Sequence, residues 1–367
     1  MLMKARIERR TLPDTGRIIA ISDVHGNLEY LRGLLNKLDL RGEDTLVFCG
    51  DIMEKGPQSL DTLHFLMDLN ERRRCWFVLG NCDYWYDERD HSKPCRDWYV
   101  RDYLLTNANG NGPGLLQQMC DAAGVTVDEN FDIDAYYKAL GDMFPREFEF
   151  LASMPQVIET EHYIFVHGGL PEGDPATWDG WYCMKNDDFM EQGRKFDKWV
   201  IVGHWPVMLY RQDITCANPI IDRESRIISI DGGCVLKDDG QLNALIIPRN
   251  GSEDFTFTAY DPFPVRRVKS AQAGSERSIY VRWGDNEVEI LSRGEEFSRI
   301  RHVRTGYELD ILTKYLYGES GVVRCNDCTD YVLPLKAGDE VSIVETTSRG
   351  YLCKHDGVSG WYYGELE

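Results

Sequence analysis

Short apolar runs that end in polar or glycine-rich turns recur along the first 250 residues of the chain. The runs at residues 17–21, 45–49 and 75–79 are apolar after at most one polar residue, which is typical of strands buried on both faces. Stretches with apolar residues at helical spacing, 27–40 and 59–70, lie between these runs. This alternation predicts a parallel α/β sheet.

The pattern changes over residues 84–155, which are rich in Trp, Tyr and Asp and are broken by an Asn-Gly run. The periodicity of residues 138–154 predicts a helix, and we interpret the whole region as a helical cap inserted into the fold. Strands are expected again at residues 162–166 and 199–202, followed by a strand pair at 226–230 and 242–247.

Beyond residue 250 the chain consists of short β segments and turns. Residues 284–290 are echoed by residues 338–343, and each copy is followed by a loop, a strand and a closing segment. This loose repeat predicts two small β modules, at residues 262–318 and 319–367. The segment at residues 361–366, Trp-Tyr-Tyr-Gly-Glu-Leu, resembles the closing strand of an SH3-like barrel. That resemblance implies either a peptide or protein partner or a plain packing role.

Acidic residues dominate the charge of this 367-residue chain. Its 41 Lys and Arg against 61 Asp and Glu give a net charge of −20, which disfavours nucleic acid as a bulk partner. The sequence contains neither a membrane-length apolar run nor a secretory signal, and its 11 cysteines lack the density of a disulfide scaffold. These features predict a cytoplasmic protein of two or three domains with no membrane association.

Polar side chains follow the predicted strands at their carboxyl ends, where open α/β sheets bind ligands. Each alone is more often a helix cap or a structural histidine, but together they form an oxygen and nitrogen ligand set suited to Mn²⁺, Fe or Zn²⁺. Six ligands are too many for one catalytic ion, so the pattern predicts two ions bridged by Asp51. Such a pair would activate water for in-line displacement at phosphorus. The six are Asp23, His25, Asp51, Asn81, His167 and His204.

The motifs Asp-x-His-Gly (23–26), Gly-Asp (50–51), Gly-Asn (80–81), His-Gly-Gly (167–169) and Gly-His (203–204) resemble those of the calcineurin-like metallophosphoesterase superfamily. Residues 50–57 are similar to the Gly-Asp-x-x-Asp-Arg-Gly-Pro motif of its phosphoprotein (serine/threonine) phosphatase branch. The related symmetrical dinucleoside-tetraphosphate hydrolases are also similar. The resemblance covers about residues 17–250.

This resemblance implies a four-layer α-β-β-α metallophosphoesterase sandwich over residues 1–250, followed by the small all-β SH3-like barrels. It also implies two divalent ions per chain, with Mn²⁺ the expected metal and Fe or Zn²⁺ the alternatives. Asp23, His25 and Asp51 would hold the first ion. The second would be held by Asp51, Asn81, His167 and His204.

The sequence departs from the family pattern near the third motif. Cys82 replaces the histidine that serves the family as general acid, and Glu54 replaces its aspartate partner. A thiol is a different acid, and Cys82 is alternatively an oxidation switch. Lys55 replaces the phosphate-binding arginine, and a second arginine has no clean equivalent. The candidate catalytic residues are therefore Cys82, Glu54 and Asp51, and the candidate substrate-binding residues are Lys55, Asn81, Lys185 and Arg194.

The expected activity is metal-dependent hydrolysis of phosphomonoesters, with phosphorylated proteins or small phosphoesters as substrates. The alternative is a phosphodiesterase or dinucleoside polyphosphate hydrolase. It is favoured by Cys82 and by cap aromatics able to stack a base: Trp85, Tyr86, Trp98 and Tyr99. A further alternative is a non-catalytic metal-binding scaffold. A separate zinc site is a weaker hypothesis, built from Cys325, Cys328, Cys353 and His355.

Overall fold

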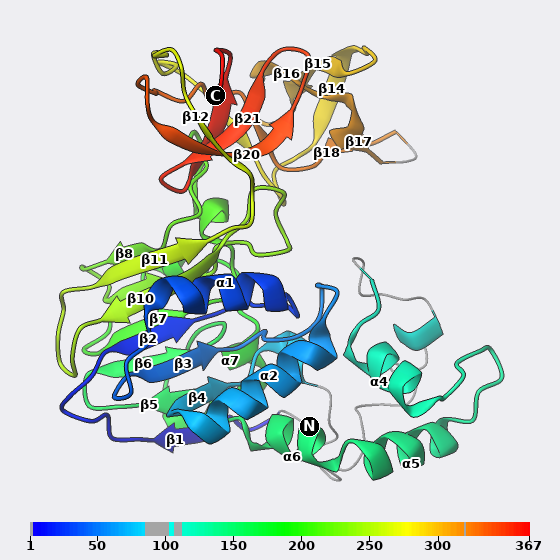
Figure 1. Cartoon of the computed structure of the whole chain (residues 1–367), viewed down its shortest axis with the longest axis vertical. Coiled ribbons are helices and arrows are strands. Elements are labelled where there is room, and N and C mark those ends of the chain that lie inside the picture. The colour runs from blue at the N-terminus through cyan, green and yellow to red at the C-terminus, as the bar shows by residue number, and fades with distance from the viewer. Residues whose placement is uncertain (1–2, 85–102, 106–111, 319–320) are drawn as a thin grey trace. The chain divides into compact units, whose positions relative to one another are not determined.

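The computed structural model describes residues 3–84, 103–105, 112–318 and 321–367, which divide into two compact units (Figure 1). The chain passes from one unit to the other after residues 206, 218, 236, 239 and 261. The α/β unit comprises Met1–Pro206, Pro219–Leu236 and Gly240–Asp261. The β unit comprises Val207–Asn218, Lys237–Asp239 and Pro262–Glu367.

Five strands form the first sheet of the α/β unit, in the order β11-β10-β2-β3-β4. Strands β2, β3 and β4 are parallel, whereas β10 is antiparallel to β2 and β11. The predicted strands at residues 17–21, 45–49 and 75–79 are confirmed. The bounds are Ile18–Ile21 (β2), Thr45–Cys49 (β3), Cys75–Val78 (β4), Leu242–Ile247 (β10) and Thr256–Tyr260 (β11).

Six strands form the second sheet, in the order β1-β5-β6-β7-β9-β8, and β6, β7 and β9 are parallel. The predicted pairing of residues 226–230 with 242–247 is wrong, because β9 lies in this sheet and β10 in the first. The bounds are Ile7–Arg9 (β1), Val157–Glu159 (β5), Tyr163–Val166 (β6), Trp199–Val202 (β7), Ile220–Asp222 (β8) and Ile227–Ser229 (β9).

The two sheets pack face to face, and helices cover their outer faces. Alternate residues of each strand, such as Ala20 and Val47 in the first sheet and Phe165 and Ile201 in the second, share one core. Helices α1 (Leu28–Leu38) and α2 (Ser59–Arg72) pack on the other face of the first sheet (Figure 1). Cys183 of α7 (Gly180–Met184) packs on the outer face of the second sheet. Because both faces of the central strands are covered, β2, β3, β4 and β7 are buried throughout.

Three helices follow in the region expected to form a cap: α4 (Leu115–Ala123), α5 (Ile133–Met143) and α6 (Pro145–Ser153). The single helix predicted over residues 138–154 is wrong, because Pro145 lacks the N–H that would continue α5 and instead begins α6. The cap aromatics Trp85, Tyr86, Trp98 and Tyr99 lie outside the described residues. Short 3₁₀ turns span Asn81–Asp83, Pro175–Thr177, Phe189–Gln192, Val207–Tyr210 and Thr313–Tyr315.

Strands and turns make up the β unit, as expected. Two antiparallel meanders begin at the two copies of the predicted repeat. The first consists of Val288–Ser292 (β14), Phe297–His302 (β15) and Glu308–Leu312 (β16), and the second of Glu340–Thr346 (β20), Tyr351–His355 (β21) and Val358–Tyr362 (β22). The remaining strands are Val265–Arg267 (β12), Tyr280–Val281 (β13), Leu316–Tyr317 (β17), Arg324–Cys325 (β18) and Cys328–Thr329 (β19).

Strand pairing in the β unit runs across the module boundary expected at residue 318. β12 pairs with β20, and β17 pairs with β18. Two separate cores result, one containing residues 279–328 and the other residues 268–366. The first meander and its core are therefore inserted between β12 and the second meander, to which β12 is added. The division at residue 318 stays a prediction.

The hypothesis of a zinc site in the β unit is not supported. Cys325 and Cys328 lie in one core with their sulfur atoms 3.8 Å apart, and Cys353 lies in the other core. Groups of three or more candidate ligands occur within the described residues, but none includes these cysteines or His355. Of the helices in the described parts of the chain, none has the length and apolar character to cross a membrane.

A largely buried ion pair holds the short segment Lys237–Asp239 within the β unit. The ammonium of Lys237 contacts a carboxylate oxygen of Asp327, and the two side chains are only 9% and 17% exposed. The same carboxylate accepts hydrogen bonds from the hydroxyl of Tyr280 at 3.0 Å and the N–H of Trp283 at 2.7 Å. Removing Asp327 would leave these donors and a largely buried charge without their acceptor.

We therefore expect Asp327→Ala to lower the free energy of unfolding of the β unit by about 3 kcal/mol, as for other broken buried pairs. Glu224→Ala is the matched control, because Glu224 pairs with Lys195 where both side chains are mostly exposed. Its cost should stay below about 1 kcal/mol. Equilibrium urea unfolding measures both, and equal losses would contradict the assigned role of Asp327.

Candidate metal centre

The predicted ligands meet where the parallel strands of both sheets end. Asp23, Asp51 and Asn81 follow strands of the first sheet, and His167 and His204 follow strands of the second. Backbone hydrogen bonds hold the loops together. The N–H of Asp23 donates to the carbonyl of Gly50 at 3.0 Å, that of His25 to Asp51 at 2.9 Å, and that of Gly203 to His167 at 2.9 Å.

Four of the predicted ligands have left-handed backbone conformations. The φ angles are 58° at Asp23, 52° at His25, 50° at Asp51 and 65° at His204. Non-glycine residues rarely adopt this region, although Asp and His tolerate it better than most. Such strain collects where function fixes the direction of a side chain. Here the sharp turn after each strand directs a ligand to the sheet edge.

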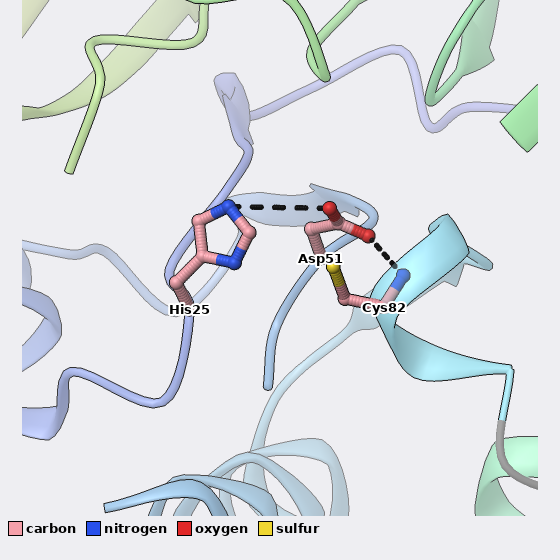
Figure 2. A group of neighbouring side chains, drawn as sticks. All are labelled: His25, Asp51 and Cys82. Atoms are coloured by element: carbon pink, nitrogen blue, oxygen red, sulfur yellow. Dashed lines mark hydrogen bonds and ion pairs between the residues drawn. The ribbon is translucent and has the colours of Figure 1, made fainter. Parts of the chain in front are cut away.

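Asp51 lies between two groups of side chains and contributes to both. Its Oδ2 is 3.9 Å from the Nε2 of His25, and its Oδ1 is 3.3 Å from the Nε2 of His167. Oδ1 also accepts the N–H of Cys82 at 2.8 Å (Figure 2). The ligand atoms of His25, Asp51 and Cys82 lie within 4.8 Å of one another, as do those of Asp51, His167 and His204. These contacts favour the predicted bridging role of Asp51, which stays a prediction.

The donor set fits divalent cations. Within the described residues, several buried polar atoms at this edge have no hydrogen-bond partner: Asp23 Oδ1, His25 Nε2, Asn81 Oδ1 and His167 Nε2. Leaving such atoms unpaired costs about 1–3 kcal/mol each. All four are oxygen or nitrogen atoms of the kinds that bind divalent metals. A cation that bonded to them would remove this cost.

Buried charges of like sign also favour a cation. Burial and the neighbouring Asp231 raise the pKa of Asp23 well above its usual value. Burial would lower the pKa of His167, but the carboxylates of Asp51 and Asp23 outweigh it and raise this pKa to about 10. Burial and the charge of His167 lower the pKa of His204 to about 4. Several carboxylates thus compete for few positive charges in a buried space, and a bound metal ion would neutralise them.

Other residues orient the ligands. The Nδ1 of His167 lies 2.8 Å from the carbonyl of Cys49, which leaves Nε2 to face the site. The Nε2 of His204 lies 2.9 Å from Asp187 Oδ1, and Asp83 accepts the N–H of Ile52 at 2.9 Å. Neither aspartate is among the site residues predicted from the sequence. Asp83 was detectable in the Gly-Asn-Cys-Asp motif, whereas Asp187 lies in a loop without a pattern.

Two glycines are required by close approach. A Cβ atom on Gly80 would lie 2.2 Å from Asp51 Oδ1, and one on Gly203 would lie 1.8 Å from Ser22 Oγ. Contacts this short leave no room for a side chain. The glycines that precede Asn81 and His204 therefore belong to the metal-centre motifs for steric reasons.

The candidate acid–base pair is arranged differently from the expectation. Glu54 accepts the hydroxyl of Tyr103 and, at 2.7 Å, the N–H of Leu115 at the start of α4. The sulfur of Cys82 accepts the Nδ2 of Asn81 at 3.3 Å. Burial and the charge of Asp51 raise the pKa of the Cys82 thiol well above its usual value. The role of Cys82 as general acid or as redox switch stays a prediction.

The candidate substrate-binding cations lie in different surroundings. The positive charge of Lys55 acts to lower the pKa of both His25 and Cys82, which places Lys55 beside the metal centre. The ammonium of Lys185 lies 3.2 Å from Asp187 Oδ1, and the same oxygen lies 2.9 Å from the Nε2 of His204. Arg194 donates to the carbonyls of Leu170 and Pro171 and lies over the rings of Phe189 and Phe196. Substrate binding by Arg194 stays a prediction, and these contacts do not favour it.

A model of the calcineurin-like phosphoesterase family matches residues 16–223, more than half of the chain. The chain belongs to this family. It is therefore a metallophosphoesterase, a hydrolase that acts on phosphate esters, and the family implies divalent metal ions at the centre described above. This membership confirms the superfamily expected from the motifs.

The phosphoesterase is similar to bacterial bis(5′-nucleosyl)-tetraphosphatases. It is 24% identical to the asymmetrical enzyme PrpE of Halalkalibacterium halodurans over 62% of this chain and 89% of that protein. It is 45% identical to the symmetrical enzyme of Enterobacter sp., but over only 17% of this chain and 22% of that protein. A solved serine/threonine phosphatase from Saccharomyces cerevisiae is 11% identical with a TM-score of 0.42, covering 71% of this chain and 85% of that one.

Asp51→Asn should remove metal from the phosphoesterase, because the bridging position needs the full charge of both oxygens. We expect the bound metal per chain to fall below one ion and kcat/KM on p-nitrophenyl phosphate to fall by at least about 100-fold. Asp44→Asn is the matched control. Asp44 is a buried carboxylate paired with Arg17 and should leave the metal content unchanged. Full metal content in Asp51→Asn would contradict the bridging assignment.

Glu54→Gln and Tyr103→Phe separate anchoring of the cap helix from proton transfer. Both break the hydrogen bonds of a buried carboxylate, and each should lower the free energy of unfolding by about 1–3 kcal/mol. If Glu54 only anchors α4, the two variants will change kcat alike on p-nitrophenyl phosphate. A loss of kcat confined to Glu54→Gln would instead support its role beside a general acid.

Proposed function

We propose that this phosphoesterase hydrolyses dinucleoside tetraphosphates and related nucleoside polyphosphates. The observation that carries the proposal is the arrangement of Cys82 and Glu54, which suits a substrate whose leaving group needs no strong acid. The similarity to bis(5′-nucleosyl)-tetraphosphatases over most of the length of PrpE supports it independently.

The leaving group decides between the candidate substrates. Cleavage of a phosphoanhydride releases a phosphate oxygen whose pKa is about 6, so this oxygen leaves as an anion at neutral pH. Cleavage of phosphoserine releases an alkoxide, which needs a proton from a well-placed acid. Cys82 has a raised pKa, and the hydrogen bonds of Glu54 run to Tyr103 and Leu115. This site is therefore better suited to anhydrides.

Other residues of the site would bind the metal ions and the polyphosphate. Asp23, His25 and Asp51 would hold one divalent ion, and Asp51 would share the second with the other ligands, Asn81, His167 and His204. Bound ions would polarise the phosphoryl oxygens and lower the pKa of a coordinated water. Lys55 contributes positive charge beside the centre, where a polyphosphate would bind. Mn²⁺ is the ion we expect at the second position.

The finer features of the fold belong to the same proposal. Helices on the outer faces of two facing sheets support the four-layer sandwich of the family. Two three-stranded meanders support SH3-like modules in the β unit, whose role would be docking of a protein or peptide. A cytoplasmic location follows from the proposed substrates.

A protein phosphatase is the second candidate. It is favoured by residues 50–57, Gly-Asp-Ile-Met-Glu-Lys-Gly-Pro, which keep most of the phosphoprotein phosphatase motif. In that case an acid other than Cys82, such as a water molecule, would protonate the serine or threonine oxygen. The fold accommodates either substrate, so kinetics must separate them.

A substrate panel with the Mn²⁺-loaded protein tests the proposal. Diadenosine tetraphosphate should give a kcat/KM at least about tenfold above those of p-nitrophenyl phosphate, bis-p-nitrophenyl phosphate and a phosphoserine peptide. Chromatography of the products separates symmetrical from asymmetrical cleavage, and Asp51→Asn is the control for contaminating activity. A preference for the peptide would establish the second candidate. Failure to turn over any of them with metal bound would favour the scaffold hypothesis.

A further inference from the structure

Cys82 lies where a metal ligand would lie. Figure 2 shows its sulfur directed toward the carboxylate of Asp51 and the ring of His25. One ligand atom from each of these three residues fits within a span of 4.8 Å. The family pattern places a general acid at this position, not a ligand, so the thiol adds a donor that the motifs do not predict.

His25 lies near a carboxylate oxygen of Asp51, within this group of three, and near one of Asp23, which is outside it. The Nε2 of His25 is 3.6 Å from Asp23 Oδ1 and 3.9 Å from Asp51 Oδ2. Atoms bonded to one ion at about 2.0–2.3 Å are separated by such distances. If Asp23, His25 and Asp51 hold an ion as predicted, the sulfur of Cys82 would be close enough to His25 and Asp51 to add a further ligand.

We propose that Cys82 binds the ion held by Asp23, His25 and Asp51 as a thiolate, which makes this position selective for Zn²⁺ over Mn²⁺. The inference rests on the metal centre of the proposed function. Soft thiolate ligands favour Zn²⁺, whereas Mn²⁺ prefers oxygen. Coordination replaces the thiol proton, which is released to solvent.

Asn81 supports a charged sulfur. Its Nδ2 lies 3.3 Å from the sulfur of Cys82 and donates a hydrogen bond to it. Hydrogen bonds to a charged acceptor are stronger than those between neutral groups. With Nδ2 engaged in this way, the Oδ1 of Asn81 is left as the donor for the second ion. One side chain thus stabilises a thiolate at the first ion and contributes an oxygen to the second.

Substitution with Co²⁺ makes the sulfur ligand visible. The full-length protein loaded with Co²⁺ should show the intense near-ultraviolet absorption of thiolate-to-cobalt charge transfer. Cys82→Ser and Cys82→Ala should lose this band while still binding Co²⁺, as measured by metal analysis. Cys216→Ser is the control, because Cys216 is a half-buried thiol of the β unit and its loss should leave the band intact.

Competition between metals gives a second readout that does not depend on activity. The ratio of Zn²⁺ to Mn²⁺ affinity should fall by about tenfold or more in Cys82→Ser and stay unchanged in Cys216→Ser. A wild-type protein that binds Co²⁺ without the charge-transfer band would overturn the thiolate ligand but leave the proposed function standing. Failure to bind Co²⁺ at all would overturn the metal centre itself.

Discussion

Repulsion between buried carboxylates is the constraint on which the catalytic edge depends. Asp23, Asp51 and Asp231 are buried where the strands end, and among the described residues the nearby positive charge comes from imidazoles and from Lys55 and Lys185. The left-handed turns that bring these side chains together add backbone strain. Cations that bind to the folded state and offset this repulsion would stabilise the fold. We therefore expect metal binding to raise the stability of this edge of the fold.

The two-sheet architecture makes the arrangement possible. Parallel strands from two sheets end together, so ligands far apart in sequence meet without long loops. The helices on the outer faces complete the burial and so keep the dielectric around the charges low. In such surroundings each charge acts strongly on its neighbours, and the replacement of one side chain, such as the family histidine by Cys82, changes both the acid and the ligand chemistry.

Local patterns in the sequence indicate the candidate ligands, but they do not indicate contacts between residues that are far apart in the sequence. Asp23 and Asp51 were recognisable because an apolar run ends two residues before each. The separation of β9 from β10 was not, because the choice of sheet depends on packing across the molecule. Glu54 was assigned to proton transfer by analogy with the family motif. Its hydrogen bond to Tyr103 joins residues 49 positions apart, so no local pattern could indicate it. Pro145 was a signal for the break between α5 and α6, because proline does not continue a helix. The prediction of one helix rested on periodicity alone.

The route of the chain between the two units bears on how such a protein arises. Met208 and Ala217 form a small core with Tyr280, although they lie in a segment that interrupts the α/β unit. A β unit that includes residues from inside the catalytic sequence cannot be transferred by joining two genes end to end. The segment that the β unit takes from the catalytic sequence begins at Val207, three residues after His204. We therefore expect the β unit and the α/β unit to be inherited together.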